Sequence, residues 1–351
     1  AAGVPPYGIE QAHELFEGIF GPVHEELTAK GIDTIIFAPR GVIGSVPPAI
    51  LVSRLPADIR APQRTRDYTD VAFLATEFNF ASAPSAASFV AARQAGPAKS
   101  SGTVTVFGPP VPPKTSAAWT EDFTARMVAE GRPDRCGTLF LSEDALTRPL
   151  TPLAGDVASR FIRTDVTGAT FTDKSTLSSD DLSDQQVLVF VTHGFFGDGF
   201  CITEPSLLTS LAEDGGDGFL SASEILDLKL DAELVLLAAC DTAREAEVAQ
   251  GIAAFFDVAQ LDCLVRSFIY AGALSVMATH WVAVYAAADL VVRRFFASSN
   301  GLAIDNALRT AQMSLIAEQK FSQPYYWGPY VVIGDASRPL IRTTGKLTSA
   351  E

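Results

Sequence analysis

The sequence predicts an α/β protein built on a largely parallel sheet with helices on both faces. Short apolar runs alternate along the chain with helical segments, a pattern typical of parallel strands covered by helices. Two such runs, 187–192 and 234–239, are followed directly by His193 and Cys240. Because ligands bind beyond the carboxyl ends of strands in open parallel sheets, we expect both side chains at one edge of the sheet.

The N-terminal third is expected to supply helices, strands and a stiff connector. Apolar residues near helical spacing predict a helix over 9–31, which Lys30-Gly31 would terminate. The Ala-, Ser- and Pro-rich stretch 82–101 predicts a helix followed by a surface loop, and the proline-rich residues 108–114 predict a stiff connector. Apolar or β-branched runs predict strands over 34–38, 71–74, 78–80 and 104–107.

The remainder alternates helices and strands after a polar interval. Thr151-Pro152 is expected to open a helix through Phe161, and the Asp- and Ser-rich residues 172–186 to be solvated. We place a boundary near the connector and the polar interval, between an N-terminal half, 1–150, and a catalytic half, 151–351. Further strands are expected over 273–279 and 330–333, and helices over 222–228, 283–296 and 302–317.

Composition and charge narrow the classes of function. The net charge is −15 and no cluster of Lys and Arg is present, which argues against nucleic-acid binding and against anionic membranes. No apolar run approaches the roughly 18 residues of a membrane helix, and no signal peptide is visible. The chain opens without Met, so we expect a fragment or a trimmed chain. No two cysteines form a Cys-x-x-Cys pair, and four are too few for a disulfide framework. We therefore expect free thiols and a location in the reducing cytoplasm.

The two strand-terminal residues suggest nucleophilic catalysis. A thiol is only slightly ionised at neutral pH, so Cys240 would need a base, and His193 is the natural candidate. Gly194 follows it and lets a backbone N–H approach a substrate closely. The segment between them leaves room for one crossover with a helix, which parallel neighbours require. A buried structural thiol and a core histidine are the alternatives. A third apolar run ends on His280-Trp281, so His280 is a competing base.

The acidic loop 213–224 raises a calcium hypothesis. Glu213 and Glu224 would occupy the first and twelfth positions of a calcium loop, but Gly215 supplies no ligand at the third. Ser221 and Glu224 also form a capping-box pattern at the start of a helix, which explains Glu224 without a metal. We therefore expect no metal site.

Several segments together resemble the CHAT domain, a caspase- and separase-like cysteine peptidase domain of clan CD that is often attached to tetratricopeptide (TPR) repeats. The resemblance covers nearly the whole chain and is fainter in the N-terminal half, where Phe80–Ala86 carries it. The other matching segments are Thr192–Gly194, Asp217–Ile225, Leu228–Val235, Ala238–Thr242, Phe268–Ala273, Trp281, Ala307–Gln312, Pro324–Trp327 and Ile333-Gly334.

The resemblance implies a caspase-like fold in which residues 1–150 form a companion lobe. It also implies a cofactor-independent endopeptidase with a His193–Cys240 dyad, acting on a protein substrate under activation control. The backbone N–H groups of Gly194 and Cys240 would hold the oxyanion. Asp198, Asp241 and Trp281 are candidates for the specificity pocket.

Regulation by TPR repeats would require residues or a partner outside this chain. A catalytically silent caspase-like interaction module is the alternative function, and a hydrolase of small amides is a third hypothesis.

Overall fold

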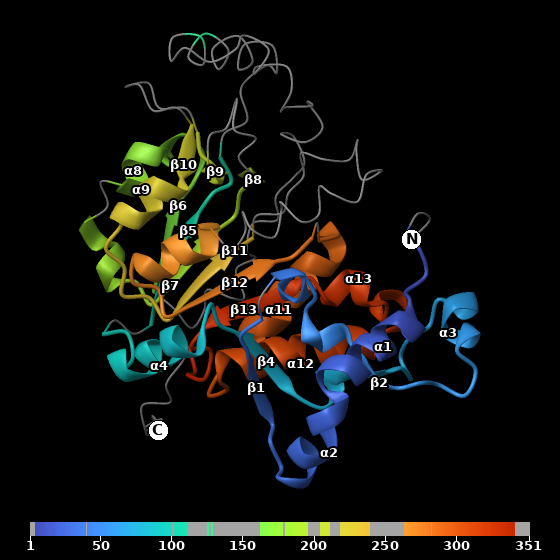
Figure 1. Ribbon diagram of the computed structural model, residues 1–351. Coiled ribbons are helices and arrows are strands. Elements are labelled where there is room, and N and C mark those ends of the chain that lie inside the picture. Colours follow the sequence, from blue (N-terminus) through green and yellow to red (C-terminus); the bar gives the residue numbers. More distant parts are fainter. Residues whose placement is uncertain are drawn as a thin grey trace, which may run out of the picture.

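An eight-stranded sheet forms the centre of the molecule (Figure 1). The computed structural model describes residues 4–39, 41–99, 102–110, 125, 128, 162–177, 180–195, 204–210, 218–238, 263–281 and 283–340. In sheet order the strands are β1 (Thr34–Phe37), β4 (Asn79–Ser82), β13 (Tyr330–Gly334), β12 (Ser275–Thr279), β11 (Leu234–Leu237), β7 (Val187–Phe190), β5 (Thr103–Phe107) and β6 (Ile162–Val166). The expected α/β class with a largely parallel sheet is confirmed.

The sheet consists of two parallel blocks that run in opposite directions. Among the described strands of this sheet, only the pairing of β12 with β13 is antiparallel, whereas β1, β4 and β13 are parallel to one another. The strands β12, β11, β7, β5 and β6 form the second parallel block. Consequently the carboxyl ends of the strands in this second block lie along one side of the sheet, across the strand direction. The carboxyl ends of β1 and β4 lie along the opposite side.

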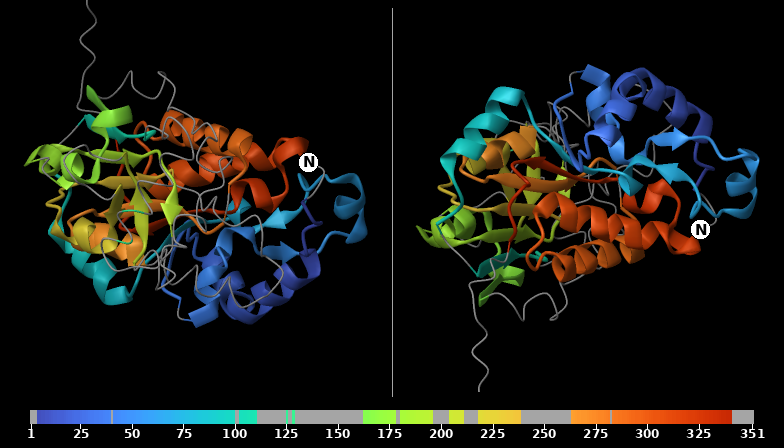
Figure 2. Two further views of the ribbon diagram at one scale, coloured as in Figure 1. Left: turned by 90° about the horizontal axis from the view of Figure 1, so that it is seen from above. Right: turned by 90° about the horizontal axis from the view of Figure 1, so that it is seen from below.

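The central strands are buried on both faces, because successive side chains point in turn into two hydrophobic cores, one on each face of the sheet. On β7, Val187 and Val189 belong to the cluster under α11 and α12. Leu188 and Phe190 belong to the cluster under α9 and the helical residues 263–270. This explains the uninterrupted apolar sequence, since neither face of such a strand meets water. Figure 2 shows orange-red α11 and α12 on one face, with the blue N-terminal helices and teal α4 on the other.

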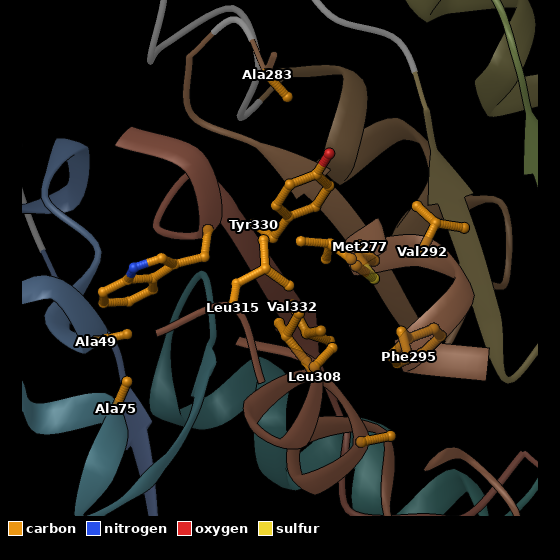
Figure 3. Packing of buried hydrophobic residues seen from close by; sticks show 14 of the residues in the cluster. Ala49, Ala75, Met277, Ala283, Val292, Phe295, Leu308, Leu315, Tyr330 and Val332 are labelled. Atoms are coloured by element: carbon orange, nitrogen blue, oxygen red, sulfur yellow. The ribbon is translucent and has the colours of Figure 1, made fainter. Parts of the chain in front are cut away.

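The first core is filled by large side chains from β12, β13 and the two long helices. Tyr330 and Val332 project from the same face of β13 beside Met277 of β12, and Leu308 and Phe295 of the helices meet them (Figure 3). Full burial of a side chain of this size contributes roughly 1.5–3 kcal/mol, so this layer holds the helices to the sheet. Residues 263–270 are helical. The other α-helices of the described residues are α1 (Ile9–Ile19), α2 (Gly21–Ala29), α3 (Arg60–Thr65), α4 (Ala86–Ala95), α8 (Asp173–Leu177), α9 (Ala222–Asp227), α11 (Tyr285–Ser298), α12 (Ile304–Ile316) and α13 (Pro324–Trp327).

Three expectations about the elements need correction. The single helix expected over 9–31 is two helices, because Pro22 lies in the first turn of α2 and cannot donate the hydrogen bond that a continuous helix needs. The strand β6 was not expected, because its sequence is polar. A polar sequence suits β6 because it is an outermost strand of the sheet. The stretch 172–186 is not simply solvated: it contains α8, and Thr172 and Thr176 are buried.

The expected division at residue 150 falls outside the described residues, as does the helix expected over 152–161. Strands from both sides of that division share the one large sheet, where β5 pairs with β7 and with β6. Within the described residues, no helix is long and apolar enough to cross a membrane. The remaining strands form two small antiparallel sheets, β2 (Val52–Arg54) with β3 (Ala72–Phe73), and β8 (Gly194–Phe195) with β9 (Ser206–Leu208) and β10 (Phe219–Ser221).

Candidate active site

The strands that precede the two predicted catalytic residues are parallel neighbours. Leu234 to Leu237 of β11 lie opposite Val187 to Phe190 of β7, in register. The pairing extends one residue further, because the N–H of Ala238 donates to the carbonyl of Phe190 at 2.9 Å. The helix expected in the crossover between the two strands is α9. The carboxyl ends of β7 and β11 therefore lie side by side at one edge of the sheet.

His193 lies just beyond β7 and is 2% exposed. Its main chain is held on two sides. The N–H of Val191 donates to Phe107 of β5 at 2.7 Å, so the chain still follows the sheet as it leaves β7. The carbonyl of His193 then accepts a hydrogen bond from the N–H of Leu208 in β9, at 2.8 Å. The histidine is thus at the junction between the large sheet and the small β8–β9–β10 sheet, which lies at one end of the large sheet (Figure 1).

Gly194 presents its N–H away from β9. It lies opposite Leu207 in the β8–β9 pairing. In an antiparallel ladder, hydrogen-bonded and non-hydrogen-bonded pairs alternate. The adjacent pair, His193 with Leu208, is hydrogen-bonded, because the N–H of Leu208 donates to the carbonyl of His193. The Gly194–Leu207 pair is therefore a non-hydrogen-bonded one. The ladder therefore leaves the Gly194 N–H directed to the other side of β8.

A second histidine follows β12, the other neighbour of β11. The N–H of His280 donates to the carbonyl of Pro329 at 3.0 Å. Burial lowers the pKa of the His280 imidazole to about 4, because a charged ring would lose its hydration. Its ring is therefore neutral around pH 7. The two histidines thus follow the two strands that flank β11.

Trp281 follows His280, and its indole packs toward α13. The indole N–H donates to the carbonyl of Tyr325 at 3.2 Å. A Cβ placed on Gly328 would lie 2.5 Å from Cγ2 of Ile50 and 3.4 Å from the Trp281 ring, so this glycine allows the helix end to approach Ile50 beside the indole. Trp281 thus lies two residues beyond the end of β12, with its indole against α13.

Cys240, Asp198 and Asp241 lie outside the described residues. Glu224, the twelfth position of the calcium hypothesis, forms the expected capping box: its carboxylate accepts from the N–H of Ser221 at 2.8 Å and from its hydroxyl at 2.7 Å. No cluster of His, Cys, Asp and Glu in the described part of the chain has the arrangement of a metal site.

One contact at the site has no signal in the sequence. The hydroxyl of Thr192, which is fully buried, donates to the carbonyl of Leu208. Thr192 attracts attention in the sequence only as the last residue before His193. Its partner is in β9, a three-residue strand that pairs with residues distant in sequence, so periodicity does not reveal the contact.

Comparison with known proteins gives one family and one fold. The model of the family described as "CHAT domain" matches residues 10–335. Tetratricopeptide repeat protein 28 of Homo sapiens is 29% identical over 149 residues, which is 40% of this chain and 6% of that protein. The same protein of Mus musculus is 32% identical over 116 residues, 33% of this chain and 4% of that protein. The chain thus spans only a small fraction of the curated relatives it matches.

Among solved structures, the complex of Porphyromonas gingivalis RgpB pro- and mature domains is similar with a TM-score of 0.50. It is 11% identical, and the match covers 96% of this chain and 73% of that chain. A similarity at this level of identity concerns the fold alone. It agrees with the mostly parallel sheet and flanking helices described above.

Proposed function

The chain belongs to the CHAT domain family, and from this premise we propose that it is a cysteine endopeptidase that cleaves a protein substrate through Cys240 and His193. The observation that carries the proposal is the adjacency of β7 and β11, which run parallel in register. His193 follows the first strand and Cys240 follows the second. A parallel sheet delivers residues in these positions to a common edge, where a base and a nucleophile are within reach of one substrate.

In the proposed reaction the Cys240 thiolate attacks the scissile carbonyl carbon, and the C–N bond of the peptide breaks. The imidazolium of His193 gives its proton to the leaving amine. His193 then takes a proton from the water that hydrolyses the thioester, which releases the acid and restores the thiolate of Cys240 and the imidazolium of His193.

Of the two histidines, His280 is poorly suited to this proton transfer. A group that serves as both acid and base works best when its pKa lies near the operating pH. Burial holds the pKa of His280 at about 4, so His280 would be a poor source of a proton at pH 7. His193 also lies beside the backbone donor proposed for the oxyanion.

The N–H groups of Gly194 and Cys240 are proposed to stabilise the oxyanion. The orientation of Gly194 supports this, because the β8–β9 ladder does not use its N–H. An oxyanion donor typically contributes about 3 kcal/mol to transition-state stabilisation.

Trp281, Asp198 and Asp241 are proposed to contribute to the specificity pocket, with the two carboxylates selecting a basic side chain. Trp281 follows the strand next to β11, which supports its placement near the substrate. A TPR-containing region outside this chain is proposed as the regulator. The name of the curated relatives supports a connection of this domain with such repeats.

The test uses a cell-permeable, peptide-like acyloxymethyl ketone that alkylates active thiolates. We expect labelling of Cys240 in the wild-type chain, and at least a hundredfold slower labelling in His193→Ala, since loss of a general base typically costs 10²–10⁴ in rate. Cys263→Ala is the matched control, because Cys263 is exposed and is not assigned to the site.

Sequencing of new N-termini in a proteome incubated with the wild-type chain gives the substrate. These cleavages should be absent with Cys240→Ala and retained with Cys263→Ala. If Cys240 reacts no faster than Cys263, and the wild-type chain produces no new N-termini, the endopeptidase proposal is wrong and the chain is an interaction module.

A further inference from the structure

Two consecutive residues at the end of β7 bind both backbone polar groups of one residue in β9. The Thr192 hydroxyl donates to the carbonyl of Leu208. The N–H of Leu208 donates to the carbonyl of His193 at 2.8 Å. The main chain around His193 is therefore attached to β9 at two points, one of which is a side-chain hydroxyl.

The attachment is to a buried and well-bonded part of the molecule. Leu207 is fully buried, and Thr209 is 2% exposed. Beyond Leu208, the N–H of Thr209 donates to the carbonyl of Gly218 at 2.8 Å, and the N–H of Ser210 donates to the carbonyl of Phe171 at 2.7 Å. β9 is thus fixed to β10 on one side and to the segment before α8 on the other.

Thr192 is fully buried, and among the described contacts its hydroxyl forms no hydrogen bond besides the one to Leu208. Burying a hydroxyl is unfavourable unless it is hydrogen-bonded, so the bond to Leu208 explains why a polar residue is accommodated between Val191 and His193. Without the hydroxyl, one of these two attachments to β9 would be lost. A single hydrogen bond permits rotation that two bonds at adjacent residues do not.

We propose that Thr192 is a positioning residue, whose hydroxyl holds the His193 main chain on β9 so that the imidazole keeps one orientation at the sheet edge. The inference rests on the proposed role of His193 as the base. Displacement of a reacting group by about 1 Å can lower a rate by roughly a hundredfold. We therefore expect Thr192→Val to lower kcat ten- to a hundredfold with little change in KM, and Thr192→Ser to restore it.

The decisive experiment does not depend on activity. The full chain is labelled with ¹³C at histidine Cε1, and the four histidines of the sequence are assigned by substitution, His193 by His193→Gln. We expect the His193 signal to shift or split in Thr192→Val and to coincide with wild type in Thr192→Ser. Thr209→Val is the matched control. The Thr209 hydroxyl accepts from the N–H of Asp173 at 3.1 Å, and among the described hydrogen bonds it is not bonded to the Leu208 carbonyl or to His193.

An unchanged His193 signal in Thr192→Val would overturn the inference, as would an equal shift in Thr209→Val. If the valine variant does not fold, Thr192→Ala removes the same hydroxyl with less crowding and serves the same comparison. Failure of the peptidase proposal would appear as the absence of Cys240-dependent cleavage and would leave the histidine spectra interpretable, so the two failures are distinguishable.

Discussion

At the scale of single residues, the two strand-terminal histidines differ in what surrounds them. His193 is at a junction of two sheets, where β5 and β9 hold the neighbouring backbone. His280 is at the end of β12, where its backbone N–H donates to the carbonyl of Pro329 at 3.0 Å. Burial lowers the pKa of the His280 imidazole, because a buried ring is penalised in its charged form.

The lowered pKa of His280 predicts how stability depends on pH. The pKa of His280 is lowered from 6.5 to about 4 in the folded chain, so below about pH 6.5 the unfolded chain binds the proton more readily. Its contribution to stability is present above pH 6.5 and is lost as pH falls toward 4, by up to about 3 kcal/mol. Urea denaturation of wild type and His280→Gln between pH 7.5 and 4.5 measures this.

The glutamine variant should lose less stability over that range than wild type does. His13→Gln is the control, because His13 is only half-buried and its Nδ1 donates to the carbonyl of Val52 at 2.9 Å. Parallel pH curves for wild type and His280→Gln would contradict the assignment of the acid-sensitive contribution to His280.

At the scale of elements, the end of β7 is shaped by close backbone contacts on the β5 side. Gly108 follows β5 with φ +101°, and a Cβ on it would lie 2.0 Å from the carbonyl oxygen of Val191. No side chain fits there without moving the strand end that carries His193. Two features therefore require glycine at position 108. One is the positive φ of its backbone, and the other is the close approach of the chain that follows β7.

We expect Gly108→Ala to destabilise the fold by about 2–5 kcal/mol, the combined cost of a strained backbone and an overpacked contact. Gly31→Ala is the matched control. Gly31 also has positive φ, +64°, but nothing lies within 4 Å of its Cβ position, so only the backbone cost of roughly 1 kcal/mol applies. Chemical denaturation compares the two. Equal losses for both variants would show that the contact with Val191 is not the cause.

At the scale of the whole molecule, the sheet unites the N-terminal and C-terminal parts of the chain. β5 pairs with β7 and with β6, and β13 pairs with β4 as well as with β12. Cutting the chain at residue 150 would leave β7 with an open edge and β6 without its partner strand, and each unpaired backbone group in a former sheet interior loses a hydrogen bond.

We therefore expect residues 151–351, expressed alone, not to fold cooperatively, and coexpression with residues 1–150 to restore the fold. Circular dichroism melting and amide NMR spectra of the separate and coexpressed halves measure this. A sharp, reversible melting transition of 151–351 alone would show that the second half is a self-sufficient domain.

The sequence by itself determined the class of the fold, the family and the strand ends that carry the candidate dyad. It could do so because burial on both faces leaves a local pattern: Val187 and Leu188 enter different cores, so both must be apolar. A capping box such as Ser221 with Glu224 is also local. These features depend on residues close together in the chain, where periodicity and spacing carry the information.

Only the tertiary structure decided which strands are neighbours and what holds each site residue. The position of β11 between β7 and β12, the reversal of direction at β13, and the contact of Thr192 with Leu208 all join residues distant in sequence. Such pairings are chosen by the packing of the whole sheet and its two cores. A strand's own side-chain pattern specifies which faces are buried and leaves its partner undetermined.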